Sequence, residues 1–86
     1  MYKVDFSQTA LKSLEQLYRS DKKLYQRLLT NIEFLERDPY MGKALKGPLK
    51  GQWSLRVGHY RIVYSIFRDK LLIIVIDVGH RKSIYQ

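Results

Sequence analysis

The chain has 86 residues, enough for a single domain with one hydrophobic core, and 45% of them are apolar, which argues against a disordered chain. It has no cysteine, which excludes a disulfide framework and thiolate metal sites. The net charge is +8, and the longest purely apolar run, residues 71–76, is too short to cross a bilayer. We therefore expect a soluble, cytoplasmic protein with no membrane partner.

The basic residues are concentrated in the second half of the chain. Residues 1–42 hold seven Lys/Arg and six Asp/Glu, whereas residues 43–86 hold nine and two. This asymmetry indicates a polyanionic partner, for which a phosphate backbone is the simplest candidate. An acidic protein partner would also fit, and a basic surface can serve solubility alone.

The first half predicts a strand and two helices. Residues 2–6 alternate weakly, as in a short strand, and Ser7 can cap a helix that ends near Ser20. Asp21 can cap a second helix, which Pro39 closes. We expect an antiparallel helical hairpin on one face of a sheet. The apolar positions recur at helical spacing, and their leucines are expected in the core: Ala10, Leu11, Leu14, Leu17, Tyr18, Leu24, Leu28, Ile32 and Leu35.

Residues 40–52 are predicted to form a long basic loop. Their sequence, YMGKALKGPLKGQ, contains three glycines, one proline and three lysines. Lys43, Lys46 and Lys50 are candidates to line the approach to a phosphate chain, and the alternative is that they are only solvated.

Residues 53–64 predict a β-hairpin whose two-residue turn is Gly58–His59. On this register Trp53, Leu55 and Val57 face Tyr64, Ile62 and Tyr60 and form one apolar face. The opposite face places Arg56 directly across from Arg61. Because like charges so placed destabilise a sheet, the pair is a candidate phosphate site.

A turn at residues 68–70 is predicted to lead into an apolar strand at residues 71–78. Both faces of that strand are apolar, so the pattern does not fix its register. The predicted fold is α+β: a two-helix hairpin on a twisted antiparallel sheet of about four strands, mixed at the N-terminal strand.

The sequence contains none of the common metalloprotease, P-loop or dinucleotide-binding motifs, and it predicts neither a metal nor a cofactor. Its arginines suit a phosphodiester, because a guanidinium donates two parallel hydrogen bonds to phosphoryl oxygens. RNA would supply its own nucleophile, the 2′-hydroxyl. His80 and Tyr85 are the candidates for proton transfer, although His80 can be an ordinary turn residue and Tyr85 an ordinary terminal one.

GHYRIVY (58–64), combined with DVGHRKSIY (77–85), resembles the RelE/ParE family of bacterial and archaeal toxins. The opening VDFSQTALKSLEQL, the helical hairpin ending at DP, and LKGPLKGQW also resemble that family, so the likeness covers nearly the whole chain. The resemblance implies a compact fold with two helices on a twisted antiparallel sheet. It also implies a neutralising antitoxin partner and cleavage of messenger RNA in the ribosomal A site.

The resemblance assigns roles to individual residues. Arg61, Arg81 and Tyr85 match catalytic positions, with Arg61 at the scissile phosphate. Arg56 matches an RNA-binding position, and Lys46, Lys50 and His80 are the further candidates to hold RNA. The sequence departs from some nuclease members at Gln52 and Ser54, where those proteins carry lysines, so the general base stays open.

The same fold also serves toxins that inhibit DNA gyrase, and fold does not determine function. The retained Tyr85 favours the nuclease branch. The hypothesis from the sequence is therefore a metal-independent, ribosome-dependent endoribonuclease that leaves a cyclic phosphate. The alternatives are a gyrase inhibitor and a non-catalytic module that binds RNA or an antitoxin.

Overall fold

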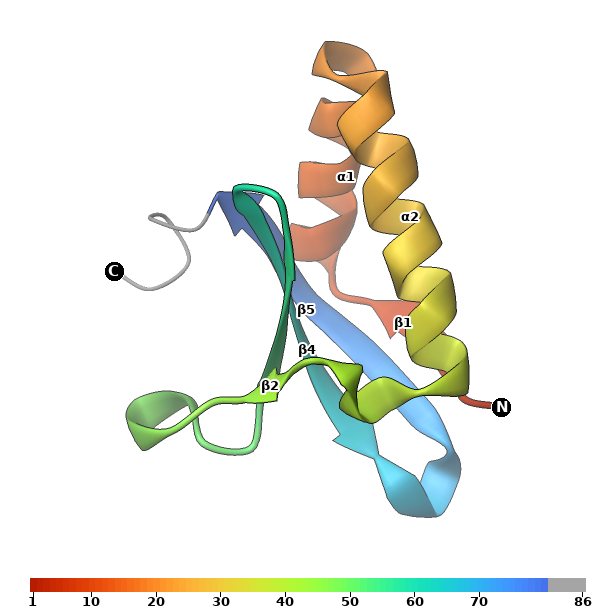
Figure 1. Ribbon diagram of the computed structural model, residues 1–86, viewed down its shortest axis with the longest axis vertical. Helices are drawn as coiled ribbons and strands as arrows, with labels where there is room; N and C mark the ends of the chain where they lie inside the picture. Colours follow the sequence, from red (N-terminus) through yellow and green to blue (C-terminus); the bar gives the residue numbers. More distant parts are fainter. Residues whose placement is uncertain (81–86) are drawn as a thin grey trace.

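A computed structural model describes residues 1–80 and shows two helices packed on a five-stranded sheet (Figure 1). The sheet order is β1-β5-β4-β3-β2, with β1 parallel to β5 and every other pair antiparallel. The elements are β1 (Lys3–Phe6), α1 (Gln8–Ser20), α2 (Lys22–Arg37), β2 (Lys43–Ala44), β3 (Trp53–Val57), β4 (Tyr60–Phe67) and β5 (Leu72–His80). Three short 3₁₀ turns occupy Pro39–Met41, Gly47–Leu49 and Arg68–Lys70. The predicted α+β class is confirmed, with one strand more than the four expected.

The two helices begin at the predicted caps. The Ser7 hydroxyl accepts a hydrogen bond from the Ala10 N–H at 3.0 Å, and the Asp21 carboxylate accepts one from the Leu24 N–H at 3.1 Å. Side-chain oxygens at these positions satisfy N–H groups that the first helical turn leaves unpaired. The helices lie side by side and extend beyond one end of the sheet (Figure 1). None of the helices within residues 1–80 is long and apolar enough to span a membrane.

The core lies between the helical hairpin and one face of the sheet. Its fully buried side chains come from both layers: Ala10, Leu28 and Leu35 from the helices, and Ile62, Tyr64, Ile73 and Val75 from the strands. The expectation that every helical leucine packs inside was wrong for Leu11, which is 51% exposed; Tyr18, on the same predicted stripe, is 50% exposed. Both side chains instead line an apolar groove formed by α1, α2 and Phe6 of β1.

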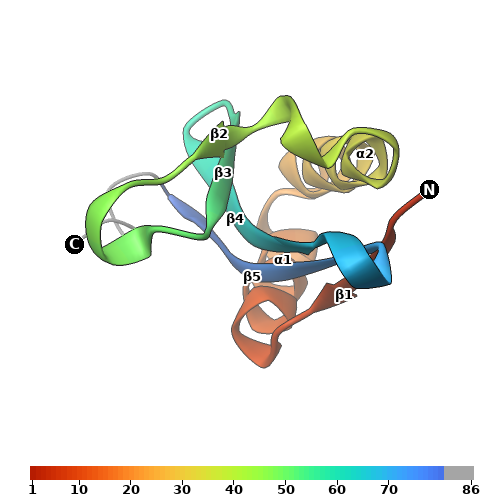
Figure 2. The ribbon, with the colours of Figure 1, turned by 90° about the horizontal axis from the view of Figure 1, so that it is seen from below.

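The predicted β3–β4 hairpin is confirmed residue for residue. Trp53 pairs with Tyr64, Leu55 with Ile62, and Arg56 with Arg61, around a turn in which Gly58 has a φ of +61°. That left-handed conformation favours glycine, which explains the residue at this position. The sheet twists strongly between β2 and β1 (Figure 2).

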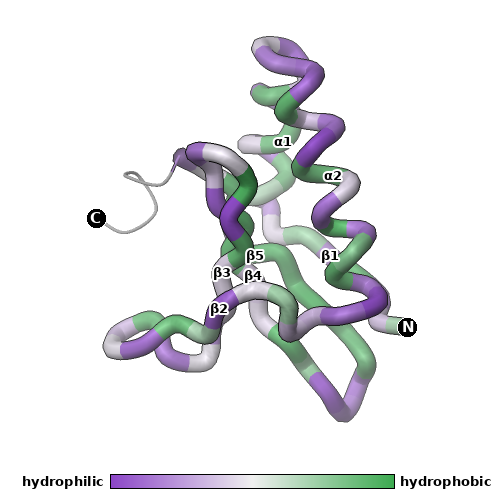
Figure 3. The backbone as a smooth tube through the Cα atoms, in the orientation of Figure 1, coloured by the Kyte–Doolittle hydropathy of each residue, from purple (hydrophilic) through white to green (hydrophobic). Residues whose placement is uncertain are grey.

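β5 is the most continuously hydrophobic strand (Figure 3), and its register contains an irregularity. Val63 pairs with Asp77 and Tyr64 pairs with Val75, so Ile76 is an extra residue opposite the step from Val63 to Tyr64. Such a bulge breaks the alternation of faces along a strand. The carbonyl of Ile76 accepts a hydrogen bond from the Ser7 hydroxyl, which ties the start of α1 to the bulge.

The segment 40–52 was predicted as a loop, and this was wrong in part. Lys43 and Ala44 form β2, which pairs with Ser54 and Trp53. The Leu45 N–H extends this pairing by donating to the carbonyl of Gln52 at 2.9 Å. Part of the basic segment therefore forms the edge strand of the sheet.

Candidate nucleic-acid interface

Arg56 and Arg61 lie on the face of the sheet opposite the helical layer. Arg56 is exposed, and its Nε donates to the carbonyl of Gly58 at 3.2 Å, which holds the side chain along the hairpin. Arg61 is half-buried, and its Nη1 donates to the hydroxyl of Ser54 at 3.4 Å. Ser54 is only 3% exposed, so it acts as a buried acceptor that orients Arg61.

A groove of about 410 Å³ lies between β2, β3 and β4 over these arginines. The residues that line it are Met41, Gly42, Lys43, Ser54, Leu55, Arg56 and Arg61. This lining contains three cationic side chains and no carboxylate. Because cations that share a concave surface raise its positive potential, the groove can bind a phosphate.

Lys43, one of the three lysines that the sequence offered as candidates to line the approach to a phosphate chain, lines the groove. It stands directly across from Ser54 in the β2–β3 pairing, on the same face of the sheet. The available signal was a lysine in the basic segment, together with the absence of a lysine at position 54. The missing information was the strand pairing, which two residues are too short to reveal.

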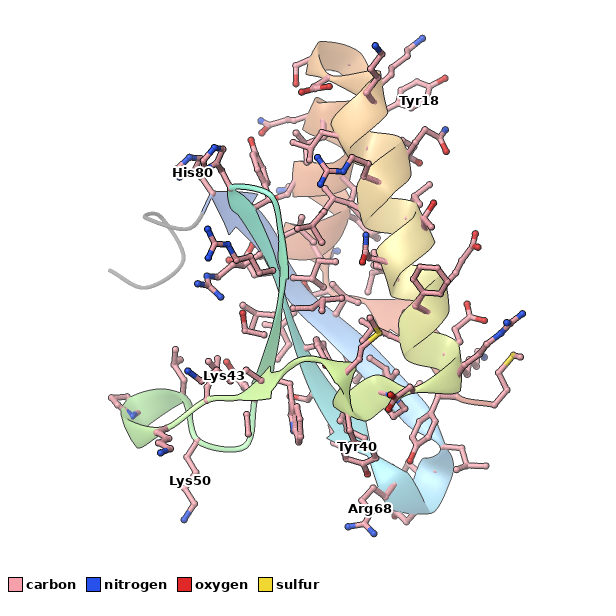
Figure 4. The ribbon with its side chains drawn as sticks, in the orientation of Figure 1. Tyr18, Tyr40, Lys43, Lys50, Arg68 and His80 are labelled. Carbon is pink, nitrogen blue, oxygen red and sulfur yellow. The ribbon has the colours of Figure 1, made fainter. Side chains whose placement is uncertain are left out.

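The structure does not bring Lys46 and Lys50 into the groove lining. Both are exposed and flank the 3₁₀ turn Gly47–Leu49 beyond β2, where Lys50 points away from the body of the protein (Figure 4). Gln52 ties the end of that loop to the sheet through its backbone, with its N–H donating to the Leu49 carbonyl at 3.0 Å.

His80 lies at the end of β5 beside the β3–β4 turn, far from Lys43 along the sheet (Figure 4). Its ring stacks on His59, with centroids 6.2 Å apart, and meets Tyr60 edge to face at 5.8 Å. Arg81 and Tyr85, the other two predicted catalytic residues, lie outside the described residues. Within residues 1–80, no three His, Asp or Glu side chains gather as metal ligands.

Comparisons with known proteins agree with this fold. Residues 4–85 match the family model described as the ParE toxin of the type II toxin-antitoxin system parDE. Toxin RelG of Mycobacterium tuberculosis is 35% identical, with 99% of this chain and 97% of that protein covered. The mRNA interferase toxin RelE of Escherichia coli K12 is 32% identical, with 94% and 84% covered.

Solved structures give the same answer. The toxin-antitoxin complex RelBE2 from Mycobacterium tuberculosis contains a chain with a TM-score of 0.77 and 32% identity, covering 93% of this chain and 98% of that one. A YoeB/ParE toxin from Agrobacterium tumefaciens shares the fold, with a TM-score of 0.81, 24% identity, and coverages of 92% and 98%. The chain therefore belongs to the RelE/ParE family of toxins of type II toxin-antitoxin systems.

Proposed function

We propose that this toxin is a metal-independent endoribonuclease that cuts messenger RNA on the ribosome, in the cytoplasm, and that a cognate antitoxin neutralises it. The observation that carries the proposal is the groove in which Lys43, Arg56 and Arg61 converge without a carboxylate. The names of relatives support it, since RelE of Escherichia coli is an mRNA interferase. Relatives solved as toxin-antitoxin complexes support the antitoxin partner.

In the proposed reaction the 2′-oxygen of a nucleotide attacks the adjacent phosphorus and the bond from phosphorus to the 5′-oxygen breaks. The products are a 2′,3′-cyclic phosphate and a 5′-hydroxyl. Arg61, oriented by Ser54, would stabilise the negative charge that grows on the phosphoryl oxygens, and Lys43 and Arg56 would hold the flanking phosphates. By the family resemblance, Arg81 would share the first task and Tyr85 would transfer a proton.

The proposed division of labour gives Ser54 and Lys43 a joint role. Some nuclease relatives carry a lysine at the position of Ser54. Here the hydroxyl at that position orients Arg61, and the ammonium group arrives from the neighbouring strand as Lys43. The groove would thus keep its positive charge while the chain lacks a lysine in β3.

A second candidate function is inhibition of DNA gyrase. The observation that favours it is the matching family model, which is described as a ParE toxin. A basic groove can also bind the phosphates of DNA, so the groove by itself does not separate the two targets.

The deciding experiment adds the purified chain to a reconstituted translation system and maps the 5′ ends of the message. We expect wild type to cut within A-site codons. Arg61→Ala should lower the cleavage rate by about 100-fold or more, since removing one transition-state hydrogen-bond donor typically has that effect. Arg81→Ala and Tyr85→Phe should also lose cleavage of the message. Lys23→Ala, which removes an exposed cation from α2, is the matched control and should cut at the wild-type rate.

The same preparation is tested for inhibition of DNA supercoiling by gyrase. Intact messages together with blocked supercoiling would show that the protein inhibits gyrase and would contradict the nuclease proposal. Intact messages, active gyrase and retained RNA binding would instead identify a non-catalytic binding module. If Arg61→Ala weakens RNA binding but leaves the cleavage rate of bound message unchanged, Arg61 holds RNA without taking part in the chemistry.

A further inference from the structure

Two guanidinium groups from different elements approach the turn of the β3–β4 hairpin. Arg56 of β3, which also lines the groove, donates from Nε to the Gly58 carbonyl at 3.2 Å. Arg27 of α2 reaches the same glycine from the helical layer, since a Cβ added at Gly58 would lie 3.7 Å from its Nη1 and 3.8 Å from its Nη2. Both arginines are exposed, and within residues 1–80 neither forms an ion pair with a carboxylate. The sheet ends at this turn, so cations from both of its faces meet there.

A pair of histidines lies at the same turn. The ring of His59, a turn residue, faces the ring of His80 nearly in parallel, with centroids 6.2 Å apart and an angle of 12° between the planes. His80 ends β5 and pairs with Tyr60, whose ring it meets edge to face. Histidine is the side chain that ordinarily gains its positive charge between pH 8 and pH 5. The charge at this turn therefore depends on pH, whereas the groove cations are lysine and arginine.

The other charged groups around the histidine pair come from α2, β3 and β5. A cavity of about 350 Å³ adjoins His80, and its lining includes Tyr60, Asp77 and only uncharged side chains from α1. The Asp77 carboxylate accepts a hydrogen bond from the next backbone N–H of β5 at 2.8 Å. Arg27 and Arg56 are the charged groups that α2 and β3 bring to the turn. The turn thus presents cations, and the one carboxylate among the described residues of this cavity lies on the side of α1.

We propose that this turn is a second phosphate-binding site, in which Arg27 and protonated His59 each neutralise one phosphate of the RNA strand that leaves the groove past Arg56. The identity of the ligand rests on the proposed function. Arg56 makes the two sites continuous, because it lines the groove and is hydrogen-bonded at the turn. A guanidinium has five N–H groups, so the bond to Gly58 leaves donors for a phosphate. Gly58 has no side chain that would cover the backbone between the two arginines.

Protonation and phosphate binding at this turn should reinforce each other. Two protonated rings that face each other repel, and two nearby arginines add to the repulsion. A phosphate at the turn offsets this repulsion, so RNA should bind more tightly when His59 is protonated, and bound RNA should favour the protonated ring. The affinity for RNA then depends on pH in a range in which the groove cations keep their charge.

The first test measures the salt dependence of RNA binding at pH 6 and pH 8. A short single-stranded RNA with 2′-O-methyl riboses, which cannot be cleaved, is titrated into the full-length protein, and its anisotropy is followed. Each phosphate contact contributes about −0.7 to the slope of log affinity against log salt. Wild type should therefore have a slope that is steeper by about 0.7 at pH 6. At one fixed salt concentration its affinity should be about two- to fivefold higher at pH 6, the effect of one exposed charge pair.

Three variants locate the effect. His59→Gln should give the same slope at both pH values, and Arg27→Gln should make the slope shallower by about 0.7 at both. Lys23→Gln removes an exposed cation one turn before Arg27 in α2, and this matched control should leave the slope and its pH dependence unaltered. The N-terminal amine also titrates near this range, but it is common to all four proteins and cancels in the comparison.

Equal wild-type slopes at the two pH values would overturn the site. A pH-dependent slope in His59→Gln, or equal slopes for Arg27→Gln and Lys23→Gln, would do the same. A second measurement reads the histidines directly, because the chain has only two and the imidazole resonances of tag-free protein report on them alone. Saturating RNA should move the titration midpoint of the His59 resonance to higher pH, and an unchanged midpoint would contradict the proposal.

These measurements need neither cleavage nor the ribosome, so they separate this site from the nuclease. If messages are cut at A-site codons while RNA binding is independent of His59 and Arg27, the turn site fails and the nuclease proposal stands. If both residues contribute to binding while no message is cut, only the nuclease proposal fails. No measurable binding of the RNA at low salt would overturn the turn site and the RNA-binding role of the groove together.

Discussion

The hydroxyl of Tyr64 determines where the segment carrying Tyr40 and Lys43 lies. This side chain is fully buried, and its hydroxyl donates to the Pro39 carbonyl and accepts a hydrogen bond from the Gly42 N–H. A Cβ at Gly42 would stand 2.5 Å from that hydroxyl and 2.7 Å from the carbonyl of Ser54. Only glycine fits so close an approach, and it lets β2 reach β3. Two residues without charge thus position a cation of the groove.

Removing this hydroxyl should destabilise the protein in a pH-dependent way. Tyr64→Phe leaves the Pro39 carbonyl without its donor, and we expect a loss of about 1–3 kcal/mol in the free energy of unfolding at pH 8. Burial raises the pKa of Tyr64 to about 12, above its ordinary value of 10.0. The protonated form therefore stabilises the fold fully below pH 10, and this contribution is lost as the pH rises from 10 to 12. The Tyr64→Phe variant has no hydroxyl to ionise at this position, so it does not lose this contribution to stability as the pH rises.

Urea unfolding of wild type and Tyr64→Phe at pH 8 and pH 11 measures both effects. The difference between the two proteins should be smaller at pH 11, because only wild type loses the contribution of the tyrosine. Other tyrosines and lysines titrate in both proteins and cancel in this comparison. A difference that stays constant between the two pH values would contradict the assignment of the raised pKa to Tyr64.

At the scale of elements, Ser7 joins a helix to an irregular strand. Its oxygen caps α1 through the Ala10 N–H, and its hydrogen is donated to the carbonyl of Ile76 at the bulge of β5. A bulge leaves a residue out of the regular ladder, and its backbone groups need partners elsewhere. One hydroxyl therefore satisfies a helix terminus and a strand irregularity together.

Ser7→Ala should accordingly cost more than the loss of an ordinary cap. We expect a decrease of about 2 kcal/mol in the free energy of unfolding, the upper end for an N-cap, because the Ile76 carbonyl also loses its donor. Ser7→Thr keeps the hydroxyl and should recover most of it. Ser20→Ala is the control, since its exposed hydroxyl donates only to the Gln16 carbonyl one turn earlier in the helix. Equal decreases in the free energy of unfolding for Ser7→Ala and Ser20→Ala would show that the hydrogen bond from Ser7 to β5 does not stabilise the protein.

Elements with a clear local signal could be predicted from the sequence, and elements that depend on distant pairing could not. The β3–β4 hairpin was predicted in full because Gly58 marks its turn and the apolar residues alternate around it. The register of β5 was not predictable, since Ile76 is extra and both faces of the strand are apolar. The two-residue strand β2 has no periodicity, so the position of Lys43 across from Ser54 could be known only from the structure.

At the scale of the whole molecule, the excess positive charge is distributed unevenly between the two halves of the chain. The half of the chain that builds most of the helical layer is close to neutral, whereas the half that contains β2 to β5 carries nearly all of the net charge of +8. Within the second half, Lys43, Arg56 and Arg61 meet in one groove. If RNA binds in this groove, removing a cation from the groove should weaken binding more than removing a cation elsewhere. If the uniformly basic surface attracts RNA, the position of the removed cation should make no difference.

The salt dependence of RNA binding distinguishes these two cases. For single-stranded RNA the slope of log affinity against log salt is about −0.7 for each phosphate contacted. Lys43→Gln removes a groove cation and should make the slope shallower by about 0.7, the share of one phosphate contact. Lys23→Gln changes the net charge equally, from an exposed position in α2, and should leave the slope unaltered. Anisotropy titrations of a short uncleavable RNA between 50 and 300 mM salt measure the two slopes. The same change for both variants would mean that the protein attracts RNA through its net charge and not through the groove.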